Sequence, residues 1–206
     1  MGINNIYIAG GIMSKGEQLQ RESEKCEIEA LGIPFYNPQD NDEINDKSNL
    51  DNTEGLAEKI VKADTQAIKG SDVVVIEPQP FAMGTMVELG QIKGMKDVAK
   101  DVNTFVNDEL ANILENFDSM PDVQIADKLL DILMGISKIT NPIIEQKVFP
   151  HYEDIRRFKG ATESEDRRSL GINQYVYGVV LDVTGGHGFY EWEDVIEELS
   201  KLKGAE

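Results

Sequence analysis

Short apolar runs alternate with longer stretches of helical spacing over the first 95 or so residues. Three of the runs, Ile6–Ala9, Ile33–Tyr36 and Val73–Ile76, are predicted strands, and the last is the strongest strand signal in the chain. Apolar residues at helical spacing predict helices over 16–31 and 56–70, and another helix follows the third run. This alternation predicts a parallel sheet with helices on both faces.

The pattern changes after about Gly94. Apolar residues form two amphipathic stripes, over 102–117 and 125–136, on either side of Met120-Pro121. Two such helices across a short turn predict a helical hairpin inserted at about 98–142. Pairs of this kind serve packing or oligomer contacts more often than catalysis.

The last third of the chain is expected to complete the sheet. Lys147–Pro150 is predicted to resume it and Gly188–Tyr190 to add an edge strand. Between them, 153–169 is charged and reads as a surface loop, and Asn173 is a candidate helix cap. We therefore predict one domain over 1–206, an α/β fold with a doubly wound parallel sheet of five strands.

The charge balance narrows the classes of partner. The 206-residue chain holds 20 Lys and Arg against 38 Asp and Glu, a net charge of −18. So acidic a surface repels phosphate backbones, and we expect no binding to nucleic acid. No stretch approaches the roughly 18 apolar residues of a membrane span, and the N-terminus does not resemble a secretory signal. A cytoplasmic protein is the simplest expectation.

Metal and cofactor motifs do not stand out in the sequence. Cys26 is the only cysteine, which leaves no intramolecular disulfide, and in its predicted helix it is expected to be a small buried residue. His151 and His187 lie far apart in the chain, and no metal-ligand companions are obvious. We find neither a Walker sequence nor a dinucleotide-binding glycine motif, so we expect neither a metal nor a cofactor.

Carboxylate chemistry is the remaining candidate. The strand at 73–76 is followed by a short loop. A helix that carries Glu88 then begins near Gly84-Thr85. Because ligands bind in the crevice beyond the carboxyl ends of parallel strands, Glu88 is a candidate nucleophile. The helix dipole is expected to hold it ionised, whereas the alternative is that it only stabilises the first turns of its helix.

Three more residues are ambiguous when taken singly. Asp64 and Asp72 each either contact a ligand or cap the local backbone. Tyr7, near the end of the first strand, either faces the same crevice or belongs to the core.

Taken together, these segments resemble the nucleoside 2-deoxyribosyltransferase family. The resemblance is carried by Tyr7-Ile-Ala-Gly-Gly, by Ala63-Asp64 ahead of Asp72-Val-Val-Val, and by Gly84-Thr-Met-Val-Glu88-Leu-Gly. It covers the first 95 or so residues and resumes at 171–178, which is similar to the segment that a neighbouring subunit lends to the family's active site. It implies a flavodoxin-like fold and a homo-oligomer with shared sites, and the helical hairpin lies outside it.

The resemblance also implies roles for individual residues. Glu88 matches the nucleophile that attacks C1′ of a 2′-deoxynucleoside, Tyr7 the tyrosine that positions it, and Asp64 an aspartate that contacts the nucleoside. Asn173 matches the residue that reaches the sugar's 5′-hydroxyl from the neighbouring subunit. The other candidate substrate-binding residues are Gly10, Asp72, Gly84 and Tyr175. Transfer of 2-deoxyribose to a second nucleobase is thus the implied reaction, with nucleosides and nucleobases as its small-molecule partners.

One position departs from the family's pattern. The family commonly has an Asp six residues before the nucleophile, where it handles the proton of the nucleobase, and here that residue is Ala82. Either another acid takes the role, from Glu77 or from the loop with Asp40 and Asp42, or the leaving base is different.

Other functions therefore stay open. The Gln79-Pro80 pair resembles the corresponding segment of the related deoxynucleoside 5′-monophosphate N-glycosidases. Those enzymes usually carry a phosphate-binding Ser where this chain has Ala82. Ser14-Lys15 is a candidate anion site for such a substrate, while Asp64 and the overall acidity oppose one. The alternatives are a nucleoside or nucleotide hydrolase, an inactive nucleotide-binding module, and a protein whose helical hairpin is an assembly surface.

Overall fold

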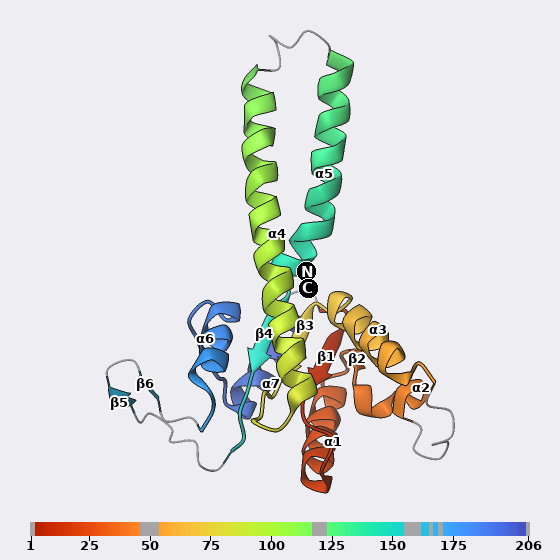
Figure 1. Ribbon diagram of the computed structural model, residues 1–206, viewed down its shortest axis with the longest axis vertical. Helices are drawn as coiled ribbons and strands as arrows, with labels where there is room; N and C mark the ends of the chain where they lie inside the picture. Colours follow the sequence, from red (N-terminus) through yellow and green to blue (C-terminus); the bar gives the residue numbers. More distant parts are fainter. Residues whose placement is uncertain are drawn as a thin grey trace. The chain divides into compact units, whose positions relative to one another are not determined.

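A computed structural model describes residues 3–45, 54–116, 123–154, 162–164, 167–168 and 171–204 (Figure 1). The chain divides into two compact units. The sheet unit comprises Met1–Ile92 and Lys147–Glu206, and the helix-pair unit comprises Lys93–Gln146.

The sheet unit is built on four parallel strands. They are β1 (Ile6–Ala9), β2 (Phe35–Tyr36), β3 (Val73–Ile76) and β4 (Lys147–Pro150). Their order is β2-β1-β3-β4, and every neighbouring pair is parallel. This is the flavodoxin-like order up to its fourth strand, so the predicted α/β fold and parallel sheet are confirmed.

The prediction of a fifth strand at Gly188–Tyr190 is wrong, because this described segment does not form a strand. Tyr190 makes one isolated parallel bridge with His151, and its N–H donates to the Pro150 carbonyl over 2.8 Å. Gly188 has a φ of +87°, and a helix begins at Trp192, so little extended backbone lies between them. The edge of the sheet therefore has one isolated β-bridge at this place instead of a fifth strand.

Eight helices and one small strand pair complete the described part of the chain. The helices are α1 (Lys15–Ala30), η1 (Pro38–Asp40), α2 (Asp42–Asn45), α3 (Leu56–Lys69), α4 (Met83–Asn116), α5 (Val123–Glu145), α6 (Gln174–Val183) and α7 (Trp192–Lys203). The strands β5 (Thr162–Ser164) and β6 (Arg167–Arg168) pair antiparallel. The segment with Asp40 and Asp42, named as a loop from the sequence, holds η1 and α2, and residues 46–53 lie outside the described chain. Most of the expected surface loop over 153–169 lies outside it too.

Alternation along the strands separates two faces of the sheet. On one face, Ile8 of β1 and Val75 of β3 pack with Ile28 of α1 and Leu199 of α7. Full burial of an aliphatic side chain stabilises a fold by roughly 1.5–3 kcal/mol, so this cluster is a main source of stability for the unit. The opposite face carries Tyr7 and lies on the side of α4.

Cys26 lies in α1 as predicted, but it is exposed rather than buried. The inward positions of α1 are Arg21, Glu24 and Ile28, which recur at helical spacing. Cys26 falls on the other side of the helix, and two charged residues take the inner positions that an apolar pattern would have filled.

The helix-pair unit contains α5 and the part of α4 that begins at Lys93. Helix α4 continues through Gly94 without a break. Val106 and Ile113 of α4 pack with Leu133 of α5. The buried Lys96 ammonium donates to the carbonyls of Ile143 (2.9 Å), Ile144 (3.1 Å) and Gln146 (2.6 Å), so a cation satisfies the C-terminal end of α5. None of the described helices is long and apolar enough to cross a membrane.

Candidate active site

A cavity of about 440 Å³ opens at the carboxyl ends of β1 and β3. Its walls come from the loop after β1, the turn after β2, one side of α3 and the first turns of α4. Gly10, Asp64, Gly84 and Glu88 all line it, so four of the predicted site residues meet here. The volume falls in the usual range for small-molecule sites, about 300–1,000 Å³.

Glu88 is held by Tyr7. The Tyr7 hydroxyl donates to Glu88 Oε1 over 2.5 Å, and the Tyr7 side chain is fully buried in β1. Burial, reinforced by the Glu88 charge, raises the pKa of Tyr7, so the phenol keeps its proton and remains a donor. The hydrogen bond fixes one carboxylate oxygen and leaves Oε2 of Glu88 for other contacts.

The electrostatics of Glu88 differ from the expectation based on the helix dipole. Burial raises the pKa of Glu88, the Tyr7 hydrogen bond lowers it, and the nearby Asp64 raises it again. Desolvation is the largest of these effects, and the outcome is a pKa above the usual value. Glu88 lies in the second turn of α4, where the dipole is already weak.

A second acid–phenol pair lies beside the first. Tyr36 donates to Asp64 Oδ1 over 3.2 Å and accepts from Asn41 Nδ2 over 2.8 Å. The rings of Tyr7 and Tyr36 stack, with centroids 5.7 Å apart. Burial raises the pKa of Asp64, and the Tyr36 hydrogen bond opposes this. Sequence reasoning missed Tyr36, although it ends a predicted strand and is the register partner of Tyr7.

Asn37 is another lining residue that the sequence did not single out. Its Oδ1 accepts from the Gln39 N–H over 3.1 Å. Its Nδ2 is buried and has no hydrogen-bond partner in the part of the chain that the structure describes. A buried donor of this kind costs free energy unless a ligand or water accepts from it.

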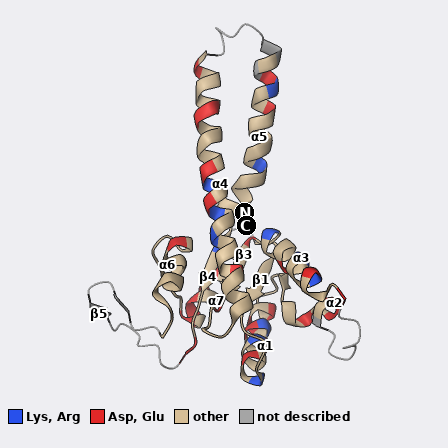
Figure 2. Ribbon diagram, viewed as in Figure 1, with Lys and Arg blue, Asp and Glu red and all other residues tan. Residues whose placement is uncertain are grey.

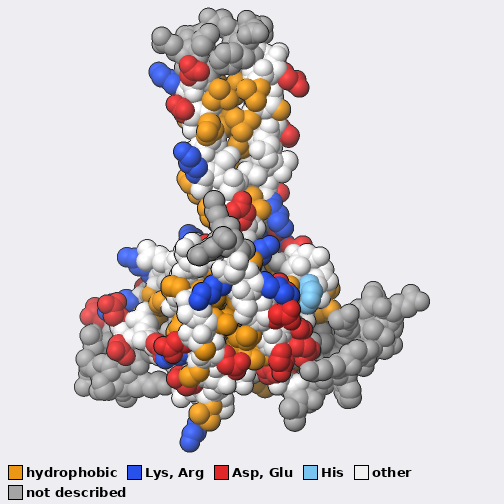
Figure 3. Space-filling view, turned by 180° about the vertical axis from the view of Figure 1, so that it is seen from behind, with side chains coloured by type: hydrophobic (Ala, Val, Ile, Leu, Met, Phe, Trp, Pro, Cys, Tyr) orange, Lys and Arg blue, Asp and Glu red, His pale blue; other side chains and the backbone are white. Residues whose placement is uncertain are grey.

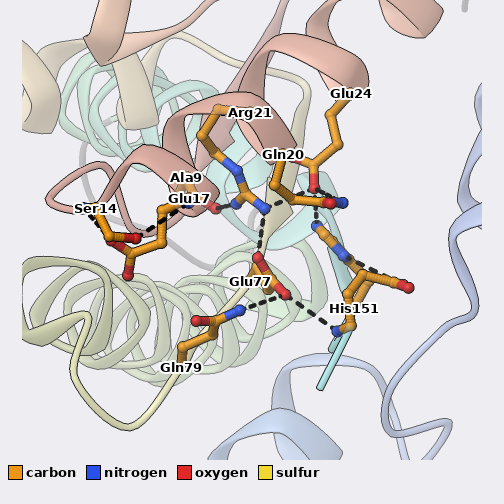
Figure 4. Close-up of polar contacts among 10 residues, drawn as sticks. Ala9, Ser14, Glu17, Gln20, Arg21, Glu24, Glu77, Gln79 and His151 are labelled. Carbon is orange, nitrogen blue, oxygen red and sulfur yellow. Dashed lines mark hydrogen bonds and ion pairs between the residues drawn. The ribbon is translucent and has the colours of Figure 1, made fainter. Parts of the chain in front are cut away.

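A buried ion cluster adjoins the cavity (Figure 4). The Arg21 guanidinium pairs with Glu24 at 2.6 Å and with Glu77, and it donates to the Ala9 carbonyl over 3.2 Å. All three charged side chains are almost fully buried. Arg21 therefore ties the end of β1 to the end of β3 and supports both loops of the cavity. A Cβ on Gly10 would lie 1.5 Å from Arg21 Nη1, so this close approach requires glycine.

Glu77 is committed to that cluster. Besides Arg21, it accepts from Gln79 Nε2 over 2.8 Å and from the Glu153 N–H over 3.0 Å. Asp40 pairs with Lys25 at 2.9 Å. Neither acid is among the residues that line the cavity, so the contacts do not favour either one in the role left open by Ala82. Ala82 itself is buried in the cavity wall.

The candidate anion site at Ser14-Lys15 already holds a carboxylate. Glu17 accepts from the Ser14 N–H over 2.6 Å, and Ser14 Oγ accepts from the Glu17 N–H over 3.2 Å. This capping box fills the N-terminus of α1. The Glu17 carboxylate also lies against Gly11, where a Cβ would come within 2.2 Å of it.

The other predicted site residues lie outside the cavity. Asp72 precedes β3, at the opposite end of the strand, and accepts from the Asn4 N–H over 2.7 Å. Asn173 is the N-cap of α6, as predicted, and accepts from the Tyr175 N–H over 2.8 Å. Asn173 and Tyr175 are both exposed. Within the described ranges, no group of three or more His, Cys, Asp or Glu is arranged to hold a metal ion.

The model of the family described as Nucleoside 2-deoxyribosyltransferase matches residues 6–124, more than half of the chain. The chain belongs to this family. The matched range of the nucleoside 2-deoxyribosyltransferase model contains Asp64 and Glu88, which line the cavity, and Tyr7, which binds Glu88, and it ends before Asn173.

Two solved structures are similar to the chain. A conserved protein from Enterococcus faecalis V583 has 20% sequence identity and a TM-score of 0.55, over 97% of this chain and 98% of its own. A 2-deoxyribosyltransferase from the psychrotolerant bacterium Bacillus psychrosaccharolyticus has 16% identity and a TM-score of 0.48, over 93% and 90%. The likeness to the first shows a shared fold. No curated protein matches the sequence significantly.

Proposed function

We propose that this protein cleaves the N-glycosidic bond of 2′-deoxynucleosides through Glu88 and transfers 2-deoxyribose to another nucleobase. The observation that carries the proposal is the 2.5 Å hydrogen bond from Tyr7 to Glu88, a residue that lines the cavity. It holds a desolvated carboxylate in one orientation, and a fixed nucleophile needs little rearrangement to attack.

The reaction has two displacement steps. A Glu88 oxygen forms a bond to C1′ while the C1′–N bond breaks, and the base leaves with the electron pair and takes a proton. The carboxylate also stabilises the positive charge that develops at C1′. A nitrogen of a second base then attacks C1′ from the face that the first base left, loses its proton, and releases Glu88. Two inversions retain the configuration of the sugar.

Asp64 is the group we assign to the proton of the base. It is the other acid among the lining residues that the structure describes, and burial raises its pKa toward the range in which it can donate a proton. In this assignment it takes over the role of the acid that Ala82 replaces. The phenol of Tyr36 keeps the Asp64 carboxyl oriented.

Charge favours an unphosphorylated substrate. Glu88 and Asp64 line the cavity, and Glu17 fills the helix end next to the loop after β1. Arg21 also lines the cavity, but Glu24 and Glu77 already balance its charge. Among the described lining residues, a 5′-phosphate would therefore meet carboxylates without a free cation, which costs affinity. This weighs against a deoxynucleoside 5′-monophosphate N-glycosidase.

Hydrolysis is the second candidate, and Ala82 is the observation that favours it. An apolar wall in place of an acid removes one polar contact to the incoming base. Water would then attack the ester more often than a base does. We also propose that Asn173 of a neighbouring subunit completes the site, which its exposed position on α6 permits.

An exchange assay tests the proposal. The full chain is incubated with thymidine or deoxyinosine and free adenine, and products are separated by chromatography. We expect deoxyadenosine, and we expect Glu88→Gln to abolish it while the exposed Glu115→Gln on the same helix leaves it unchanged. Free 2-deoxyribose without exchange supports the hydrolase. Normal exchange by Glu88→Gln contradicts both.

A further inference from the structure

Helix α5 carries a continuous apolar stripe. Isoleucine or leucine recurs at alternating intervals of four and three residues, at Ile125, Leu129, Ile132, Ile136, Ile139 and Ile143. This is the a/d pattern of a coiled coil, with a period of 3.5 residues. We refer to these six residues as the α5 stripe.

Most of the α5 stripe faces solvent. Ile139 is 70% exposed, Ile132 59% and Ile125 57%. Helix α4 packs mainly on another side of α5, at Leu130 and Leu133, and of the stripe residues the partly buried Ile136 also packs in that cluster. Figure 3 shows hydrophobic side chains gathered on one face of the helix pair. An exposed, contiguous set of large aliphatic residues is unusual on a soluble surface and indicates a binding site.

We propose that the α5 stripe is a homodimer seam, which packs against the same stripe of a second copy of this chain. A heptad stripe is complementary to another heptad stripe, because each a/d residue inserts between four residues of the facing helix. Around a two-fold axis one stripe supplies both sides of the interface. Isoleucine at both a and d favours bundles of more than two helices, as two helix pairs would form.

The charges agree with a second copy as the partner. The chain has a net charge of −18, so two copies repel each other wherever their acidic surfaces meet. The e and g positions beside the stripe hold no acid, since they are Ala126, Lys128, Leu133, Gly135, Thr140 and Pro142. Figure 2 shows only a few charged positions on α5. Two copies can therefore meet through the stripe without repulsion between charges of the same sign.

The sequence of α5 also favours an antiparallel arrangement. Pairing Ile132 with Ile136 of the second copy brings Leu129 level with its Ile139, and apolar residues meet at every step. It also sets Asp131 level with Ser137 of the second copy and Lys128 level with its Thr140, whereas an in-register parallel pairing sets each charged residue level with its own copy.

Light scattering and sedimentation of the full chain test the seam. The variant with Ile132→Lys and Ile139→Lys puts two charges into it and should weaken dimerisation at least about tenfold. Met134→Lys is the matched control, since Met134 is 53% exposed on the same helix but lies off the stripe. Circular dichroism checks that each variant folds.

Cross-linking provides a readout that another interface would not imitate. Leu129→Cys and Ile139→Cys are combined with Cys26→Ser, and mild oxidation should join two chains. Positions 129 and 139 of one helix are about 15 Å apart, too far for a disulfide within the chain. A monomeric chain at high concentration overturns the proposal. So does association that the two lysines leave unchanged, together with no cross-link.

Discussion

Tyr7, in the middle of β1, and Glu88, in the second turn of α4, are joined by a 2.5 Å hydrogen bond although 81 residues separate them in the sequence. The parallel sheet brings them together, because β1 and β3 are adjacent and α4 follows β3. The bond lowers the pKa of Glu88 against the desolvation that raises it.

Removal of the phenol hydroxyl should shift the pH dependence of the reaction. In Tyr7→Phe the ionised form of Glu88 loses a donor, so its pKa rises further and the acid limb of kcat/KM moves to higher pH. We expect kcat to fall roughly tenfold or more, since the carboxylate also loses its orientation. Tyr190→Phe serves as the control. An unchanged acid limb in Tyr7→Phe would mean that the hydroxyl does not act on the nucleophile.

Neutralising Glu88 should stabilise the fold at neutral pH. Its folded pKa lies above the unfolded value of about 4.5, so the folded state binds the proton more tightly, and stability falls as pH rises through this window. Glu88→Gln removes that loss and should raise Tm by a few degrees at pH 7, on the order of 1 kcal/mol. The gain should vanish below the unfolded pKa. Thermal melts across pH measure it, and a lower Tm for Glu88→Gln at pH 7 contradicts it.

The buried ion cluster predicts a large cost when its cation is lost. Arg21→Met removes the guanidinium that pairs with the buried Glu24 and Glu77 and should lower the free energy of unfolding by about 3–5 kcal/mol. Lys25→Met removes a more exposed pair, Lys25–Asp40, and should cost less than about 1 kcal/mol. Urea titrations compare the two, and equal costs would show that burial does not set the energetics.

Two glycines of the cavity should differ in how much stability they lose on substitution by alanine. Gly10→Ala places a Cβ 1.5 Å from Arg21 Nη1, so the loop or the ion cluster must shift, and we expect a loss of about 1–3 kcal/mol. Gly84→Ala meets no atom within 4 Å and should leave stability within about 0.5 kcal/mol. Chemical denaturation of both variants measures this. A destabilised Gly84→Ala beside a neutral Gly10→Ala reverses the expected order.

Strong local patterns in the sequence predict the frame of the sheet. The apolar runs at Ile6–Ala9, Val73–Ile76 and Lys147–Pro150 are strands with the bounds expected, because a buried parallel strand needs a continuous apolar run. Asn173 caps its helix for the same local reason. These features depend on neighbours in the chain, which a sequence displays directly.

Features that depend on distant partners were less predictable. The burial of Arg21 and Glu24 requires Glu77, over fifty residues away, and an apolar pattern places such charges at the surface. The prediction that Cys26 is buried is wrong for a related reason, because charged residues occupy the inner face of its helix. In the site, the pairing of Tyr36 with Asp64 follows from the sheet register, which no single motif encodes.

Mass spectrometry of the protein with a 2′-deoxynucleoside and no acceptor base tests the role of Glu88 most directly. We predict a peptide that contains Glu88 and carries one deoxyribosyl group. This group disappears when adenine is added, as deoxyadenosine forms. Base exchange at the normal rate with no sugar on that peptide, or with the sugar on another residue, would contradict it.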